Sequence, residues 1–224
     1  MTLLLSVALQ TGCAKPILSL ATNWTAKDPN PQVILDEAEA DAKNGNYTNA
    51  LAKQIWIYDN SLKYEPAFAG VRLSFALQDW IHLGKVYPPA LEKLKAVRDK
   101  AGENAGNMTG QKLYEAFEDF EAINNALGQD VKTKELFSWL DSNKLVEARD
   151  VFNLAEPALV KSKAYRLCGK YINADASFAQ ALQSYRMTSK IAKSPKLGQK
   201  VQDFAEKKFE NTTTTIIALL VVND

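Results

Sequence analysis

The chain has 224 residues and a formal net charge of +1, because 27 lysine and arginine residues nearly balance 26 aspartate and glutamate residues. This length can bury a sizeable core as one large or elongated domain. Balanced charge argues against a broad nucleic-acid footprint, which needs clustered positive charge. The single histidine, His82, excludes multi-histidine metal sites within one chain. No apolar stretch reaches the roughly 20 residues of a membrane-spanning helix.

The N-terminal stretch contains an apolar run, Leu3 to Leu9, followed by Thr11-Gly12-Cys13. This pattern resembles the end of a bacterial lipoprotein signal, in which a small residue precedes an acylated cysteine. The resemblance implies a signal over residues 1–12, a lipid on Cys13 and a place on the periplasmic side of a bacterial envelope. The alternative is a buried first helix or a disordered start in a cytoplasmic protein. Residues 13–30 have little periodicity and predict a tether or extended lead.

Residues 31–64 predict a first helical hairpin. Asn30-Pro31 is typical of an N-cap and first turn, so a helix is expected from Pro31 to about Lys43. A turn follows at residues 44–46. The next helix is expected over residues 47–64, with a stripe of apolar residues at helical spacing, namely Leu51, Ile55, Tyr58 and Leu62.

Proline and glycine divide the central part into further helices. Glu65-Pro66 predicts the end of one helix and the start of the next. That next helix is expected to end at Gly84, and a helix opened by Pro88-Pro89 is expected to end at Gly102. Residues 103–110 form the clearest break in the pattern and could separate two halves or form a long loop.

Two triplets repeat a turn glycine, an aromatic residue and a small residue: Gly45, Tyr47 and Ala50, then Gly84, Tyr87 and Ala90. This spacing resembles the tetratricopeptide repeat, and residues 69–103 resemble a group of uncharacterised bacterial proteins of that kind. The resemblance implies an all-α fold of tandem antiparallel helical hairpins, an α-solenoid, and says nothing about a reaction. The expected repeat domain covers residues 31–209.

The second half continues the helical pattern. Helices are expected over residues 111–127, ended by Gly128, and over residues 130–140 and 145–155, separated by a turn at residues 141–143. Glu156-Pro157 is expected to open another helix, as Glu65-Pro66 does. Ser194-Pro195 is expected to cap the last one.

The C-terminal segment, residues 210–224, changes character. Residues 212–222 are β-branched and apolar, which predicts a short strand. A lone strand leaves backbone groups unpaired, so it would pair with Ile17 to Ala21, with its own copy or with a partner, or would instead adopt a helix or a tail.

The function predicted from these patterns is a non-enzymatic protein–protein interaction or scaffold module, with no cofactor or metal and with another protein or peptide as partner. The alternative is a structural subunit that self-associates through the C-terminal strand. A carboxylate-dependent hydrolase is favoured least, although a helix carries Glu115, Glu118, Asp119 and Glu121. Five residues near the hairpin turns are candidates for partner binding, because Trp, Tyr and Arg supply much of the energy of interfaces: Trp56, Tyr58, Arg72, Trp80 and Tyr87. Most of the four aromatic residues are expected to lie in the core, and Arg72 is expected to be exposed. Outside this set, His82 is expected to be structural, and Cys168 is expected to pack as a small apolar residue.

Overall fold

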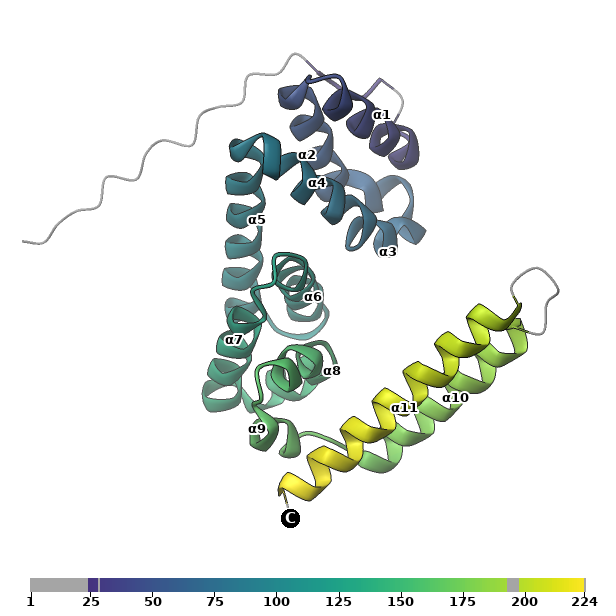
Figure 1. Ribbon diagram of the computed structural model, residues 1–224. Coiled ribbons are helices and arrows are strands. Elements are labelled where there is room, and N and C mark those ends of the chain that lie inside the picture. Colours follow the sequence, from purple (N-terminus) through teal and green to yellow (C-terminus); the bar gives the residue numbers. More distant parts are fainter. Residues whose placement is uncertain (1–23, 28, 193–197, 224) are drawn as a thin grey trace, which may run out of the picture.

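A computed structural model describes residues 24–27, 29–192 and 198–223 of the chain (Figure 1). Within these residues it contains eleven α-helices, one 3-10 helix and no strand, so the predicted all-α class is confirmed. The signal, Cys13 and the Ser194-Pro195 cap lie outside the described residues. The helices are α1 (Pro31–Lys43), α2 (Tyr47–Tyr64), η1 (Pro66–Phe68), α3 (Ala69–Arg72), α4 (Phe75–Val86), α5 (Pro88–Asn107), α6 (Gly110–Ala126), α7 (Asp130–Asn143), α8 (Leu145–Lys161), α9 (Tyr165–Gly169), α10 (Ala174–Ala192) and α11 (Gly198–Asn223).

The first hairpin, α1 and α2, has the predicted bounds. The side chain of Asn30 accepts hydrogen bonds from the backbone N–H groups of Gln32 (3.0 Å) and Val33 (3.2 Å), as an N-cap does. Gly45 turns the chain with φ of +80°, a conformation that favours glycine. The buried face of α2 differs from the predicted stripe, because Leu62 is 37% exposed while the polar residue Gln54 is 3% exposed.

The helix expected from Pro66 to Gly84 is broken into η1, α3 and α4, and Gly84 does not end it. Gly84 lies inside α4, which continues to Val86. A Cβ on Gly84 would lie 3.0 Å from Cβ of Leu91, so this glycine allows α5 to approach α4 closely.

The break predicted at residues 103–110 is much shorter, because α5 continues through Gly102 to Asn107. A Cβ on Gly102 would lie 2.7 Å from the ring of Phe120. The prediction that Gly102 ends the helix is therefore wrong: the missing side chain accommodates a ring of α6. At the end of α5, Lys144 donates to the carbonyl of Gly106 (2.8 Å).

Two local predictions in the second half are also wrong. Residues 141–143 belong to α7, and Pro157 lies inside α8. The helix continues past the proline because its inner face is packed, with Ala155, Ala158 and Leu159 at most 1% exposed. Burial of that face outweighs one missing hydrogen bond.

The predicted C-terminal strand is wrong, because residues 212–222 belong to α11. The threonine run fits a helix since Thr212 and Thr215 donate side-chain hydrogen bonds to carbonyls four residues earlier, at 2.9 Å. Ile216 and Leu219, three residues apart, are the buried positions of this stretch. Apolar contacts of α11 with α9 and α10 thus override the strand propensity of its sequence.

Three hydrophobic clusters support an arc-shaped body. The first contains Phe68 and lies at α1–α4. The second contains Trp80 and lies at α2, α4, α5 and α6. The third contains Phe117 and lies at α5–α9. Figure 1 shows α10 and α11 as a long hairpin that leaves this body at α9. Leu219 belongs to the third cluster, together with the fully buried Cys168, so the C-terminal end of α11 is docked on the body.

Candidate functional site

Three of the five predicted binding residues, Tyr58, Arg72 and Trp80, lie together in the interior. The guanidinium of Arg72 donates to both carboxylate oxygens of Asp119, at 2.5 and 3.2 Å. It lies 4.9 Å from the ring centre of Tyr58, which meets the ring of Trp80 edge to face at 6.4 Å. Arg72 is only 8% exposed, so the prediction that it is exposed is wrong.

The charges of this cluster are internally paired. The Tyr58 hydroxyl donates to Asp119 at 2.6 Å, and burial together with the negative charge of Asp119 raises the pKa of Tyr58. Burial favours a lower pKa for Arg72, but the hydrogen bond and negative charge of Asp119, together with Tyr58, outweigh burial and raise that pKa. The cluster therefore joins α2, α3 and α6. The sequence suggests only a catalytic role for Asp119. No local sequence pattern indicates that Arg72 and Asp119, 47 positions apart, contact each other.

The other two predicted binding residues lie elsewhere. Trp56 stacks on Tyr64 at 5.6 Å and packs against the cluster of Phe68. Tyr87 stacks on Tyr47 at 5.9 Å and packs against the cluster of Trp80. The five residues thus do not form one continuous surface.

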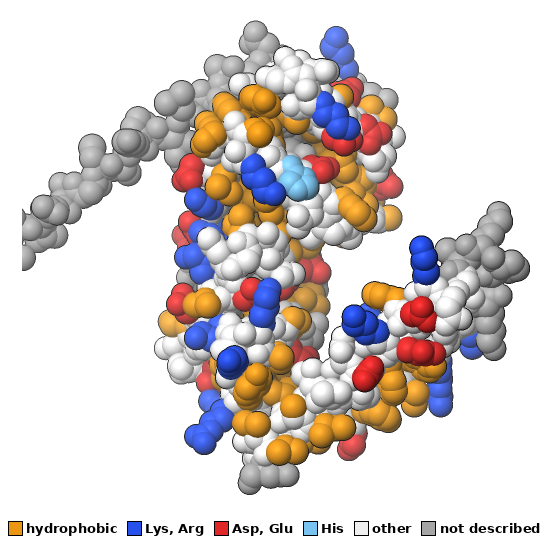
Figure 2. Space-filling view, viewed as in Figure 1, with side chains coloured by type: hydrophobic (Ala, Val, Ile, Leu, Met, Phe, Trp, Pro, Cys, Tyr) orange, Lys and Arg blue, Asp and Glu red, His pale blue; other side chains and the backbone are white. Residues whose placement is uncertain are grey.

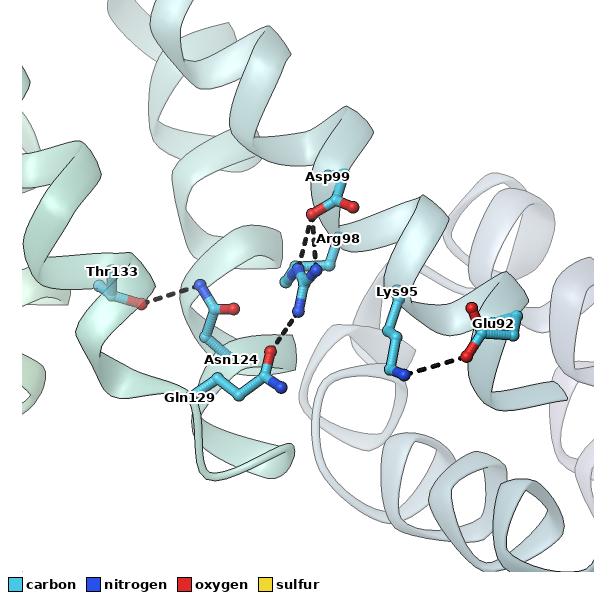
Figure 3. Close-up of polar contacts among 7 residues, drawn as sticks. All are labelled: Glu92, Lys95, Arg98, Asp99, Asn124, Gln129 and Thr133. Carbon is cyan, nitrogen blue, oxygen red and sulfur yellow. Dashed lines mark hydrogen bonds and ion pairs between the residues drawn. The ribbon is translucent and has the colours of Figure 1, made fainter. Parts of the chain in front are cut away.

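A second polar cluster, partly buried, joins α5, α6 and α7 (Figure 3). Arg98, 4% exposed, donates to Asp99 (2.7 and 2.9 Å) and to the side chain of Gln129. Beside it, Asn124 donates to the hydroxyl of Thr133 at 3.1 Å, and both side chains are fully buried. This cluster was not predicted. It lies at the junction between successive helices, where it fixes their relative positions.

Glu121 is the acidic group with the most altered environment. Burial, and then repulsion from Asp130 and Glu118, raises its pKa to about 7, with partial compensation by Lys161. Asp130 itself pairs with Lys161 at 2.8 Å. Among the described residues, no three His, Cys, Asp or Glu side chains are grouped so as to hold a metal ion.

A groove lies between the body and α11, and we call it the α11 groove. It consists of three adjoining cavities of about 260, 290 and 470 Å³. The first and second share Val160 and Thr215, and the second and third share Tyr165 and Val222, so the three follow one another along α11. From Asn211 to Val222 along the helix, the groove is roughly 17 Å long at 1.5 Å per residue.

The walls of the α11 groove are largely apolar, and its ends carry opposite charges. Val160 and Tyr165 form one wall, and Ala218 and Val222 lie on the other. Glu156 lines one end, whereas Lys163 and Arg166 line the other. This groove was not predicted, because residues 212–222 were expected to form a strand.

Apolar side chains are also exposed along the α10–α11 hairpin, where orange atoms lie on its visible surface in Figure 2. No residue of α10 is buried. The large apolar residues exposed on the hairpin are Phe178, Met187, Ile191, Phe204, Ile217, Leu220, Val221 and Val222.

Comparisons with protein-family models, with curated proteins and with solved structures each found no match. Among the described helices, none is both long enough and apolar enough to cross a membrane.

Proposed function

We propose that this protein is a non-enzymatic helical-repeat module that holds a segment of another polypeptide in the α11 groove. The row of three neighbouring cavities between α11 and the body, which share lining residues, is the observation that carries this proposal. A groove of roughly 17 Å accommodates about five residues of extended chain at roughly 3.3 Å each, or three helical turns. Its apolar walls supply the contact energy, since burying apolar surface is the main driving force of association.

The charges at the ends of the groove give the bound segment a direction. Glu156 at one end favours a basic residue, and Lys163 and Arg166 at the other favour an acidic one. Complementary charges of this kind set register and orientation more than affinity. The partner is therefore a short apolar segment flanked by opposite charges.

The helix arrangement supports a tetratricopeptide-like interpretation of the body. Consecutive helices of the body pack as pairs, most extensively α5 with α6, α1 with α2 and α7 with α8, and α4 also packs on α5. Alternate helices, α2 with α4 and α6 with α8, also pack on each other, as stacked hairpins do. Proteins built in this way commonly act by presenting a binding surface.

The proposal is tested by filling the groove. Ala218 is exposed and lines the groove, so Ala218→Trp should block it. Ala179 is exposed on α10, and Ala179→Trp is the matched control. Crosslinking in the source cells, with quantitative identification of the crosslinked proteins, should show partners that are kept by wild type and Ala179→Trp but lost in Ala218→Trp.

Two results would contradict this function. Partner sets that are identical for both tryptophan variants would exclude the groove as the binding site. If light scattering showed a dimer that Ala218→Trp converts to a monomer, the groove would instead serve self-association, which is the alternative function.

We further propose that Cys13 carries a lipid that anchors the module to a bacterial envelope. The Leu3 to Cys13 pattern supports this attachment. Intact mass and membrane fractionation of the natural protein test it. Wild type should gain the mass of acyl chains and sediment with membranes, whereas Cys13→Ser should do neither.

A further inference from the structure

The row of cavities along α11 extends beyond the α11 groove, onto the α10–α11 hairpin. A fourth cavity, of about 20 Å³, lies between α10 and α11 and shares Thr212 with the groove. This cavity is small, but its lining includes five short side chains, those of Ala181, Ser184, Thr188, Ala205 and Thr212. Because the distance between packed helices depends on the size of the side chains at their contact, a further helix can approach this surface closely.

The lining residues of α11 lie on one face of the helix, which we call the α11 stripe. Lys208, Thr212, Thr215, Leu219 and Val222 each line at least one of the four cavities, and they follow one another at steps of four, three, four and three residues. This is the spacing of the seam between two packed helices. From first to last residue the stripe is roughly 21 Å long at 1.5 Å per residue. In Figure 1, α11 runs from the outer end of the hairpin back to α9.

An extended segment finds few hydrogen-bond partners on the α11 stripe. The hydroxyl groups of Thr212 and Thr215 already donate to carbonyl groups of α11, at 2.9 Å, and the side chains of Ala218 and Val222 are apolar. Among the described residues, the protein has no strand whose edge could pair with an extended backbone. A helix pairs its own backbone N–H and C=O groups, so it can lie on this surface without leaving them unsatisfied.

Charges beside the α11 stripe determine where the bound segment carries its own. Lys163 and Arg166 line the same cavity as Val222, whereas Glu156 lines the same cavity as Thr215. Thr215 and Val222 are seven residues apart, which is about two helical turns. A helix that lies alongside α11 therefore meets both charges if its acidic and basic residues are about two turns apart.

We propose that the α11 groove binds an amphipathic α-helix of another polypeptide, at least about 14 residues long, along the α11 stripe from Lys208 to Val222. Its apolar face packs on α11 and on the short side chains of α10. It carries an acidic residue beside Lys163 and Arg166 and a basic residue beside Glu156. This inference rests on the proposed function and adds the conformation, length and charge order of the bound segment.

Site-specific photocrosslinking measures that conformation in the full chain. A benzophenone amino acid replaces Lys208 or Val222, which are exposed and line the cavities, or replaces Glu210, an exposed position of α11 outside their lining, as the matched control. After crosslinking in the source cells, mass spectrometry identifies the partner residue captured at each position. We expect the residues captured at Lys208 and Val222 to lie about 14 residues apart in one partner if it is helical. An extended chain would give about six, at roughly 3.3 Å each.

The outcomes separate this inference from the proposed function. A separation of about six residues, capture at Val222 without capture at Lys208, or capture of a second copy of this chain would each overturn the helical partner and leave the groove as a binding site. Equal capture at Glu210 and at the groove positions, or no capture at any position, would contradict the proposed function together with this inference.

A synthetic copy of the captured segment gives a second measurement. Calorimetry with the full chain should show at least tenfold weaker binding when a proline is placed at the centre of the peptide, because proline breaks a helix. Equal affinity of the two peptides would overturn the helical partner.

Discussion

Arg72 of α3 and Asp119 of α6, 47 positions apart, form a two-bond ion pair in which the arginine side chain is 9% exposed. Removing one member of a buried pair leaves the other charge unpaired and costs about 3 kcal/mol or more. We therefore expect Asp119→Asn to lower the free energy of unfolding by about that amount, measured by urea denaturation.

The exposed pair of Lys95 and Glu92 provides the control for this prediction. Its atoms lie 3.0 Å apart, and the Glu92 side chain is 71% exposed (Figure 3). Glu92→Gln should change the free energy of unfolding by less than about 0.5 kcal/mol, as exposed pairs generally do. The double variant Arg72→Met, Asp119→Leu should recover part of the loss. A double variant less stable than Asp119→Asn would contradict this account.

Glu121 predicts a pH dependence of stability. Burial raises its pKa to about 7 in the folded protein, against an ordinary value of 4.5. Between these values the folded state holds more protons than the unfolded state, so the free energy of unfolding falls as pH rises through this window. A shift of this size corresponds to about 3 kcal/mol at about 1.4 kcal/mol per pH unit, and because Glu121 is only partly buried, solvent screening reduces the effect to about half of that or less.

Glu121→Gln should remove this loss. We expect the variant to be more stable than wild type above pH 7 and to approach wild type below pH 4.5, measured by urea denaturation at a series of pH values. Glu135→Gln, an exposed substitution on α7, controls for the loss of one negative charge. A difference between Glu121→Gln and wild type that stays constant across the series would show that the environment of Glu121 is not the cause.

The sequence predicted those elements whose ends are determined locally. Asn30 caps α1 with its own side chain, and Gly45 and Gly128 adopt positive φ. The residues at these helix ends therefore determine by themselves where the helix begins or ends. The helices α1 and α2 accordingly have the predicted bounds.

Predictions failed where contacts between residues far apart in the sequence determine the local structure. Gly84 and Gly102 were interpreted as helix ends because glycine often follows a helix, but both lie inside helices against Leu91 and Phe120. The C-terminal residues have strand propensity, yet packing on α9 and α10 makes them helical. Arg72 was expected to be exposed, but it is buried because it pairs with Asp119, whose proximity no local pattern reveals.

The two glycines of α5 predict opposite effects of alanine. Gly102→Ala must displace the ring of Phe120, and overpacking of this kind costs about 1–3 kcal/mol. Nothing lies within 4 Å of a Cβ on Gly106. Gly106→Ala should therefore raise the free energy of unfolding, by up to about 1 kcal/mol, through helix propensity. Thermal melting of both variants measures the contrast, and a stabilising Gly102→Ala would contradict the close approach of α5 and α6.

Cys168 reports how firmly α11 is docked on the body. Burial raises the pKa of this thiol to about 11, and it packs in the same cluster as Leu219. In a Cys13→Ser background at pH 8, iodoacetamide should therefore label the native protein far more slowly than the urea-unfolded protein, because the thiolate is the reactive form.

Leu219 and Leu220 then separate docking from general stability. Leu219 is 1% exposed, whereas its neighbour Leu220 is 42% exposed. Leu219→Ala creates a cavity that costs about 2–5 kcal/mol, so it should loosen α11 and accelerate labelling of Cys168 by at least tenfold. Leu220→Ala should leave the labelling rate near that of the parent. Equal acceleration by both variants would mean that Cys168 becomes accessible without release of α11 from its docked position.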